Sequence, residues 1–340
     1  MSAQKLEALL QLHHLHYARS VEYKNVVDNL FQANAITSIA DLPYLPASIF
    51  KNLDLRSIPS ESVYKTMTSS GTTGQNKSRI FLDKETASAQ QKALIKIIHD
   101  VLGASRVPML VLDSVLQIKN KLTFSARGAG IMGFMIFGNK INFALTDEIE
   151  LDWAAIKSFC EINTQNPKLI YGFTSVIWQE VIEKLPDNAE ILGKQKAVLI
   201  HGGGWKKLID RNISSENFSQ AIKCKLGPNV KLIDYYGMIE QPGSIFVSGS
   251  NGVFQTNSYN DLIIRDFNTF EIVPNGQKGL IQVLSILPRS YPGYSILTED
   301  VGYIVEESIN RDGQLVKSFV VEGRVPSSEI RGCSNTYERL

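Results

Sequence analysis

The segment Thr66-Met-Thr-Ser-Ser-Gly-Thr-Thr-Gly-Gln-Asn-Lys-Ser-Arg79 is the most informative stretch of this 340-residue chain. It places glycines and small hydroxyl residues beside Lys77. Glycines let successive backbone N–H groups converge on an anion, the hydroxyls add donors, and the lysine adds a positive charge. This composition is typical of a loop that holds a polyphosphate.

The residues on either side of the loop indicate a β-hairpin, because 62–67 and 78–82 both have strand character. A Walker loop needs a glycine directly before its lysine and a helix directly after it. Asn76 occupies the glycine position here, and a predicted strand follows, so the Walker class is disfavoured. A flexible hairpin without a ligand is the other alternative. Eight Ser, Thr and Gly residues in the ten positions 66–75 favour a ligand instead.

Outward from the hairpin, the pattern of apolar residues predicts alternating helices and strands. Helices are expected at 6–17, 21–31, 84–102 with Asp83 as N-cap, 152–161 and 174–184, and strands at 107–112, 169–171, 196–200 and 230–234. Such alternation predicts a parallel sheet with helices on its faces. From about Ser244 short strands and Asn-Gly turns indicate a β-rich lobe, as in a distorted barrel.

These patterns suggest a division into four parts. We expect an N-terminal helical lead-in over 1–60 and an αβ core with the phosphate loop over 61–243. A β-rich lobe is expected over 244–325, followed by a C-terminal tail over 326–340 that contains Cys333.

The overall composition excludes several classes of protein. Hydrophobic residues make up 44% and charged residues 20%, which is ordinary for a globular chain and not for a disordered or fibrous one. Thirty-five Lys and Arg against 34 Asp and Glu give a net charge of +1, so a dominant nucleic-acid binder is not expected. Three cysteines form no disulfide framework, and no apolar run reaches the ~18 residues of a membrane span. A cytoplasmic protein is therefore expected.

Four motifs then resemble, in order, those of the adenylate-forming enzymes, which include acyl-CoA synthetases, luciferases and adenylation domains. They are Thr68-Ser-Ser-Gly-Thr-Thr-Gly74, Tyr235-Tyr-Gly-Met-Ile-Glu240, Leu297-Thr-Glu-Asp-Val-Gly302 and Glu322-Gly-Arg324. The resemblance implies an α/β fold: the N-terminal domain of that superfamily, with parallel-sheet αβ layers plus a β-rich lobe. Most of the usual small C-terminal domain is expected to be missing.

Three further segments narrow the resemblance to the LuxE-type acyl-protein synthetases. These are His201-Gly-Gly-Gly-Trp-Lys-Lys207, Tyr236-Gly-Met-Ile-Glu-Gln241 and Ser328-Glu-Ile-Arg-Gly-Cys-Ser334. The family implies activation of a fatty or other carboxylic acid by ATP and Mg²⁺ to an acyl-adenylate. The acyl group would then pass to Cys333 and on to a partner reductase protein. An acyl- or aryl-CoA ligase of the phenylacetate type and an inactive adenylate-binding subunit of a reductase complex are the alternatives.

The resemblance also assigns roles to particular residues. Cys333, Lys77 and Glu240 are the expected catalytic residues, and Glu240 is the expected Mg²⁺ ligand. The nucleotide would be bound by Thr68, Ser69, Ser70, Gly71, Thr72, Thr73, Gly74, Gly202, Gly203, Gly204, Tyr236, Gly237, Asp300 and Arg324. The acyl pocket would involve Tyr171, Gly172 and Phe173, with 130–138 as a second candidate wall; either segment could equally be core.

Three positions depart from the family pattern. Ile239 replaces a threonine, Glu299 replaces the glycine before Asp300, and Ser327 stands where the hinge acid is expected. A metal site at His13, His14 and His16 is not favoured, because no other clear ligand is near them in sequence.

Overall fold

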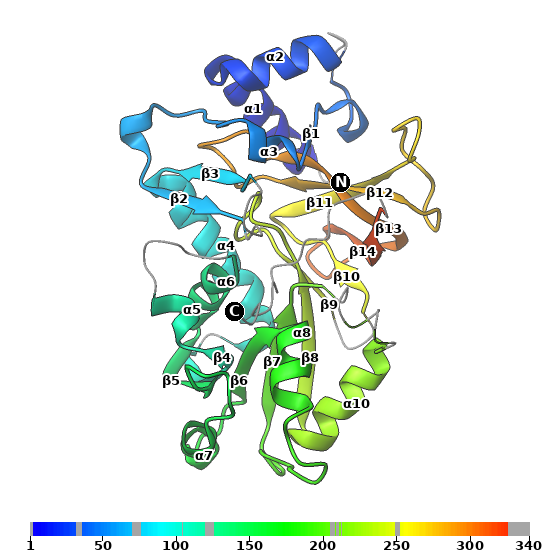
Figure 1. Ribbon diagram of the computed structural model, residues 1–340. Helices are drawn as coiled ribbons and strands as arrows, with labels where there is room; N and C mark the ends of the chain where they lie inside the picture. Colours follow the sequence, from blue (N-terminus) through cyan, green and yellow to red (C-terminus); the bar gives the residue numbers. More distant parts are fainter. Residues whose placement is uncertain are drawn as a thin grey trace. The chain divides into compact units, whose positions relative to one another are not determined.

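The computed structural model describes residues 3–31, 36–69, 76–103, 105–119, 126–204, 208, 211, 213–248 and 252–325 (Figure 1). The chain forms two compact units. Unit 1 comprises Met1–Ile97, Gly237–Val247 and Val253–Ile330, and unit 2 comprises Ile98–Tyr236, Ser248–Gly252 and Arg331–Leu340. The residues with expected functions are divided between these units, so each unit is described by itself.

Unit 2 contains a parallel sheet, which confirms the αβ alternation expected from the sequence. Its strands are β4 (Val107–Ser114), β5 (Gly138–Leu145), β6 (Lys168–Phe173), β7 (Ala197–Gly202) and β8 (Val230–Tyr236), arranged in the order β5-β4-β6-β7-β8. Every residue of β4, β6 and β7 is buried, as expected for central strands with packing on both faces.

The helices of unit 2 follow their strands. They are α5 (Leu116–Lys119), α6 (Ala126–Met135), α7 (Trp153–Glu161), α8 (Thr174–Val176), the π-helical segment η3 (Ile177–Ile182) and α10 (Ser215–Lys225). The N-cap of α7 is Asp152, whose carboxylate accepts a hydrogen bond from the Ala155 N–H at 2.9 Å. The helix expected over 174–184 is present from Thr174 to Ile182, but it changes from α to π geometry after Val176.

Unit 1 contains an antiparallel sheet. Its strands are β10 (Phe254–Gln255), β11 (Asn260–Arg265), β12 (Gly279–Ser285), β13 (Ser295–Ile309) and β14 (Leu315–Arg324), in the order β11-β12-β13-β14-β10, and β1 (Leu45–Pro46) pairs in parallel with β13. The described strands form an open ladder and not a barrel, and β13 alone spans 15 residues. The strand β9 (Phe246–Ser248) lies where the chain passes between units.

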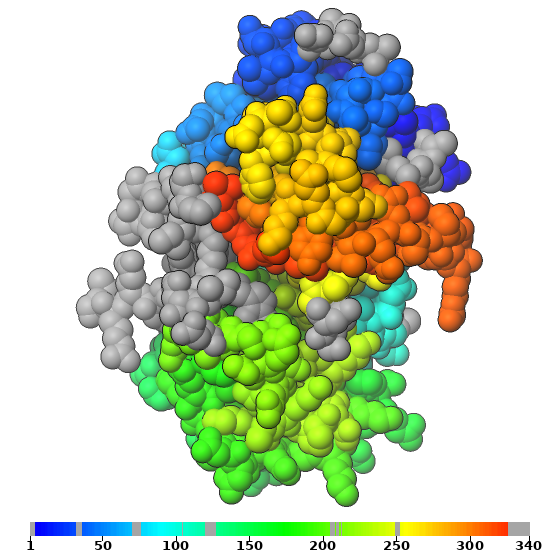
Figure 2. Space-filling model, turned by 90° about the vertical axis from the view of Figure 1, so that its right-hand side faces the viewer, coloured from blue at the N-terminus to red at the C-terminus, as the bar shows by residue number. Residues whose placement is uncertain are grey.

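Two loops of unit 1 are prominent on its surface (Figure 2). The β11–β12 connection, gold in the centre of Figure 2, exposes Phe267, Phe270 and Ile272. The β13–β14 hairpin ends in an exposed turn, orange at the right of Figure 2, in which Gly313 has a φ of +74°.

The expected hairpin around residue 70 is confirmed. Strands β2 (Lys65–Thr68) and β3 (Arg79–Leu82) pair antiparallel, with Thr68 opposite Arg79. The helix α4 (Lys84–Leu102) begins only after β3, and Asp83 caps it by accepting a hydrogen bond from the Thr86 N–H at 2.7 Å. No helix begins directly after the loop, so the Walker arrangement does not apply.

The remaining helical elements of unit 1 are α1 (Ala3–Arg19), α2 (Val21–Leu30), η1 (Ile39–Asp41), α3 (Ile49–Asn52) and η2 (Ser60–Ser62). Two of the N-terminal histidines are buried hydrogen-bonding residues. His13 Nδ1 lies 2.9 Å from Tyr23 Oη, and His16 lies 2.8 Å from Ser57 Oγ and 3.0 Å from the Pro288 carbonyl oxygen. The helix α1 is therefore attached to the rest of unit 1 through its histidines.

This attachment predicts loss of stability in mild acid. Burial lowers the pKa of His13 to about 4 and of His16 to about 3, against 6.5 for an unperturbed histidine. As the pH falls below 6.5, these two histidines therefore bind protons in the unfolded chain before they do so in the folded protein. The free energy of unfolding should decrease by about 1.4 kcal/mol per pH unit per histidine between pH 6.5 and 4.

Urea unfolding at pH 7 and pH 5 measures this dependence. In His16→Asn the pH dependence should be shallower than in the wild type, while the exposed His14→Asn serves as the matched control. Equal slopes in all three proteins would contradict the assignment.

No helix among the described residues combines the length and the apolar character required to cross a lipid bilayer.

Candidate functional site

The base of the phosphate loop is closed by two hydrogen bonds. The Ser69 N–H donates to the Ser78 carbonyl oxygen at 3.1 Å, and the Ser78 N–H donates to Ser69 Oγ at 2.9 Å. Thr68 is the last residue of β2, and Lys77 is exposed. The loop residues Ser70, Gly71, Thr72, Thr73 and Gly74 lie outside the described residues. Thr68, Ser69 and Lys77 therefore stand at the two ends of the loop, as expected.

Glu240 lies in unit 1 on the turn that follows β8 in the chain, and only 8% of its surface is exposed. The Tyr291 hydroxyl donates to its carbonyl oxygen at 2.9 Å. The next residue, Gln241, donates through Nε2 to the Gly293 carbonyl oxygen at 2.8 Å. These bonds hold Glu240 and Gln241 against the 291–293 turn.

A close backbone contact fixes the same turn from α4. Gly243 has a φ of +76°, and a Cβ built on it would lie 2.3 Å from the carbonyl oxygen of Gln90. Only glycine fits this position, because both the conformation and the space exclude a side chain. Glu240 is thus carried on a rigid segment.

The Glu240 carboxyl interacts with two other parts of the expected site. Burial raises its pKa above the usual value, while the nearby Ser78 hydroxyl and the positive charge of Arg324 act in the opposite direction, and the charge of Asp300 adds to the rise. Unit 1 therefore brings Glu240 together with the base of the phosphate loop and with the Asp300–Arg324 pair.

Asp300 and Arg324 face each other across β13 and β14. They are register partners, and Arg324 Nε donates to Asp300 Oδ1 at 2.8 Å. Their side chains are 16% and 26% exposed, so both remain accessible to a small molecule. The second carboxylate oxygen and the guanidinium edge are suited to ribose hydroxyls or phosphate. Their role as nucleotide ligands stays a prediction.

The donor set around Glu240 is compatible with Mg²⁺. The Ser78 hydroxyl is buried and makes no hydrogen bond among the described residues, and it lies close enough to the Glu240 carboxyl to lower its pKa. No group of three or more His, Cys, Asp or Glu side chains suited to a metal occurs among those residues. Mg²⁺ is usually held by one or two carboxylates together with phosphates and water. One buried carboxylate beside a phosphate loop fits that pattern.

Unit 2 carries the expected glycine residues at the carboxyl edge of its parallel sheet. Gly202 ends β7, and the glycine turn formed by Gly202, Gly203 and Gly204 has φ values of +92° and +82° at its last two residues. A Cβ at Gly203 would lie 2.7 Å from the ring of Phe173. This edge is where parallel sheets bind ligands.

The three residues expected in the acyl pocket lie on β6 and are buried. The ring of Tyr171 stacks on Phe134 of α6 at a centroid distance of 4.4 Å. A Cβ at Gly130 would lie 2.8 Å from Tyr171 Oη and 3.0 Å from Phe173 Cζ. Tyr171 and Phe173 thus pack tightly against α6, while Gly172 is enclosed by Ile177 and Leu112, and contact of the three residues with an acyl chain stays a prediction.

The motif from Tyr236 to Glu240 crosses the boundary between the units. Tyr236 ends β8 in unit 2 and is half-buried, whereas Gly237 begins the returning segment of unit 1. Cys333 lies outside the described residues.

Sequence reasoning missed two features near these residues. Ser78 was assigned only to a strand, although its place beside Lys77 was a usable signal. The second feature is a buried ion pair, in which Arg127 donates from Nε and Nη2 to the two carboxylate oxygens of Asp113 at 2.5 and 2.7 Å. An aspartate directly after the apolar run 107–112 was the signal for it.

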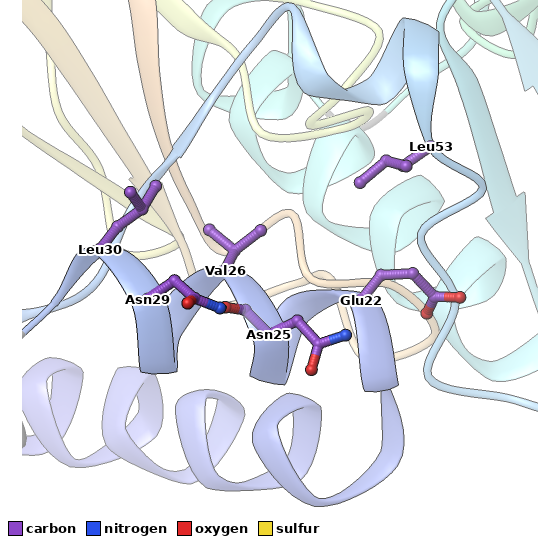
Figure 3. Close-up of a pocket in the computed structure, with 6 residues that line it drawn as sticks. All are labelled: Glu22, Asn25, Val26, Asn29, Leu30 and Leu53. Carbon is purple, nitrogen blue, oxygen red and sulfur yellow. The ribbon is translucent and has the colours of Figure 1, made fainter.

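A shallow groove of about 390 Å³ lies elsewhere on unit 1, along α2 (Figure 3). Val26, Leu30 and Leu53 line it together with Glu22, Asn25 and Asn29. None of these residues belongs to the expected nucleotide or acyl site.

Solved structures share this architecture. A 2-hydroxyisobutyryl-CoA ligase, described in the postadenylation state in complex with R3-HIB-AMP, aligns with 94% of this chain and 67% of its own at a TM-score of 0.66 and 14% identity. The ATP-bound MatB of Rhodopseudomonas palustris aligns with 79% of this chain and 49% of its own at a TM-score of 0.50 and 14% identity. The chain therefore has the fold of the adenylate-forming ligases.

The family follows from a match over nearly the whole sequence. Residues 3–339 match the model of the LuxE acyl-protein synthetases, so the chain belongs to this family. It is 23% identical to a long-chain-fatty-acid–luciferin-component ligase of Vibrio harveyi, over 94% of this chain and 83% of the relative. A protein of the same name from Aliivibrio fischeri is 22% identical, over 94% and 84%. The resemblance inferred from the motifs is confirmed.

Proposed function

We propose that this protein activates a fatty acid with ATP and transfers the acyl group to a protein thiol. The observation that carries the proposal is the grouping in unit 1 of Glu240, Ser78 at the base of the phosphate loop, and the Asp300–Arg324 pair. The names of the Vibrio and Aliivibrio relatives support a long-chain fatty acid as the substrate. A cytoplasmic location stays a prediction from composition.

In the first step a carboxylate oxygen of the acid attacks the α-phosphorus of ATP. The bond between the α-phosphorus and its bridging oxygen to the β-phosphorus breaks, and pyrophosphate leaves. The loop from Ser69 to Lys77 would hold the β- and γ-phosphates, and Asp300 would hold the ribose through its hydroxyl groups. Glu240 would hold Mg²⁺, which when bound neutralises charge on the phosphates. The chain contributes positioning and electrostatic stabilisation.

In the second step the thiolate of Cys333 would attack the acyl carbon. A thioester forms, the acyl–phosphate bond breaks, and AMP leaves with the electron pair. The acyl group would then pass to a thiol of a partner reductase.

Pyrophosphate exchange over a panel of carboxylic acids, followed by intact mass measurement, tests both steps. We expect exchange with fatty acids and an acyl adduct that hydroxylamine removes. Cys333→Ser should retain exchange and lose the adduct completely, whereas Cys224→Ser, a change at an exposed thiol, should retain both. An adduct that persists in Cys333→Ser would remove the thiol from the mechanism.

The two alternative functions can be distinguished from the proposed one by coenzyme A consumption and by pyrophosphate exchange. A CoA ligase of the phenylacetate type would consume coenzyme A stoichiometrically and would not need Cys333. An inactive adenylate-binding subunit, suggested by Ile239 and Ser327, would bind ATP without pyrophosphate exchange on any acid.

The burial of Glu240 predicts how the exchange rate depends on pH. Its raised pKa means that the carboxylate needed for Mg²⁺ is lost at a higher pH than for an exposed glutamate. Ser78→Ala removes the hydroxyl group that lowers this pKa, so the acidic limb of the rate profile should move to higher pH. The control is Ser88→Ala, on the exposed side of α4. An unchanged acidic limb in Ser78→Ala would show that this hydroxyl does not act on Glu240.

A further inference from the structure

The glycine turn of unit 2 begins at Gly202, whose carbonyl oxygen is bound by the buried side chain of Thr174, and His201 in turn binds Thr174. Thr174 Oγ1 lies 3.1 Å from the Gly202 carbonyl oxygen and 3.0 Å from His201 Nδ1. Thr174 is fully buried, and His201 is 3% exposed. The strand register places Phe173 opposite Gly202 and Gly172 opposite His201, so Thr174 is the first residue past the end of β6.

The chemistry of these atoms determines which groups donate. A carbonyl oxygen only accepts, so the single hydroxyl proton of Thr174 is used for Gly202. The other bond then requires His201 to donate from Nδ1 to Thr174 Oγ1. Asp234 Oδ1 lies 3.7 Å from the same nitrogen, and its charge favours a proton there. His201 is therefore in the Nδ1–H tautomer.

The imidazole is also neutral. Burial lowers the pKa of His201 to about 3, and its ring lies 5.0 Å from the ring of Phe218, centroid to centroid. Thr174 Oγ1 and Asp234 Oδ1 both lie next to Nδ1 of His201. In a catalytic triad the nucleophile and the acid contact opposite nitrogens of the histidine ring, so these three side chains do not form a triad. Their arrangement points to positioning instead of proton transfer.

We infer that Thr174 and His201 are positioning residues that fix the Gly202 carbonyl, and with it the glycine turn, in the conformation that receives the adenine nucleotide. The inference rests on the proposed function, in which Gly202, Gly203 and Gly204 bind the nucleotide. The two hydrogen bonds restrain the peptide that leads into Gly203, whose φ of +92° and contact with Phe173 leave little freedom on the other side. Loss of the hydroxyl frees one end of the turn.

The test compares Thr174→Val, which keeps the shape and loses the hydroxyl, with Thr174→Ser, which keeps the hydroxyl. Binding of α,β-methylene ATP is measured by calorimetry, and KM for ATP and for the best acid by pyrophosphate exchange. Thr174→Val should bind the analogue about five- to tenfold more weakly, as expected for the loss of one buried hydrogen bond. KM for the acid should stay within about twofold, and Thr174→Ser should restore binding.

Several results would overturn the inference. If the wild type and a folded Thr174→Val bind the ATP analogue equally well, the inference is wrong and the proposed function is unaffected. The same conclusion follows if Thr174→Val raises KM for ATP and KM for the acid by the same factor. A wild-type protein that binds no adenine nucleotide removes the proposed function and the inference together. If Thr174→Val does not fold, a measurement on the wild type still tests the inference. Nitrogen-detected NMR of the imidazole should show the neutral Nδ1–H tautomer of His201 from pH 8 to 5, and an Nε2–H tautomer would overturn the arrangement.

Discussion

Glu240→Gln is expected to reduce the rate of ATP–pyrophosphate exchange by about 100- to 1000-fold. Glutamine keeps the size of the side chain and its backbone anchors, including the bond from Tyr291 to the Glu240 carbonyl oxygen. It removes the negative charge that a hard cation prefers. The same change should leave stability unchanged or slightly higher, because burial makes the charged form of Glu240 costly, as its raised pKa indicates.

The measurement pairs the exchange rate with urea unfolding. Glu306→Gln is the matched control, since Glu306 is exposed on β13 and the change removes the same charge. A Glu240→Gln protein that retains more than about a tenth of the exchange rate would contradict an essential metal-binding role, since losing one electrostatic contact costs at least ~100-fold.

Arg127→Met should lower the free energy of unfolding by about 3–5 kcal/mol. Asp113 is fully buried, and its partner Arg127 is 3% exposed, so the variant leaves a carboxylate without its cation in the interior. Methionine fills the space of the aliphatic part of the arginine side chain, so the substitution removes only the charged, hydrogen-bonding end. The loss should exceed that of most single substitutions.

An exposed ion pair provides the comparison. Lys119 and Asp147 lie 3.2 Å apart and are 55% and 45% exposed, so Lys119→Met should cost no more than about 1 kcal/mol. The double variant Asp113→Leu/Arg127→Met should recover much of the stability lost in Arg127→Met, because no buried charge remains. If Arg127→Met and Lys119→Met lower the free energy of unfolding equally, the buried ion pair contributes no more to stability than the exposed one.

The sequence predicted those parts of the fold that depend on local signals. The continuous apolar run of β4 identified a buried strand, Asp83 marked the start of a helix, and the glycine-rich segment between β2 and β3 identified a hairpin. Each signal lies within a few residues of the element that it predicts.

The features that the sequence did not predict depend on distant contacts. The hydrogen bond that His16 makes to Pro288 joins residues 272 positions apart, and β1 pairs with β13, which is also far away in the chain. The π-helical segment η3 was missed because the apolar spacing of 174–184 fits an α-helix as well.

The sequence suggested candidate residues for the site but not their arrangement. Motif order identified Glu240, Asp300 and Arg324, yet their proximity depends on the register of β13 against β14. The hydroxyls of Ser78 and Thr174 were overlooked, because serine and threonine are common and gain significance only from the buried groups that they contact.

The length of the β13–β14 hairpin offers a practical benefit for biophysical work. Irregularities in its pairing lie between the Asp300–Arg324 rung and the solvent-facing end, and residues 305–314 are exposed. A fluorophore or affinity label attached at Asp312 would therefore leave that rung undisturbed. Labelled protein of this kind would report on encounters with other proteins in solution.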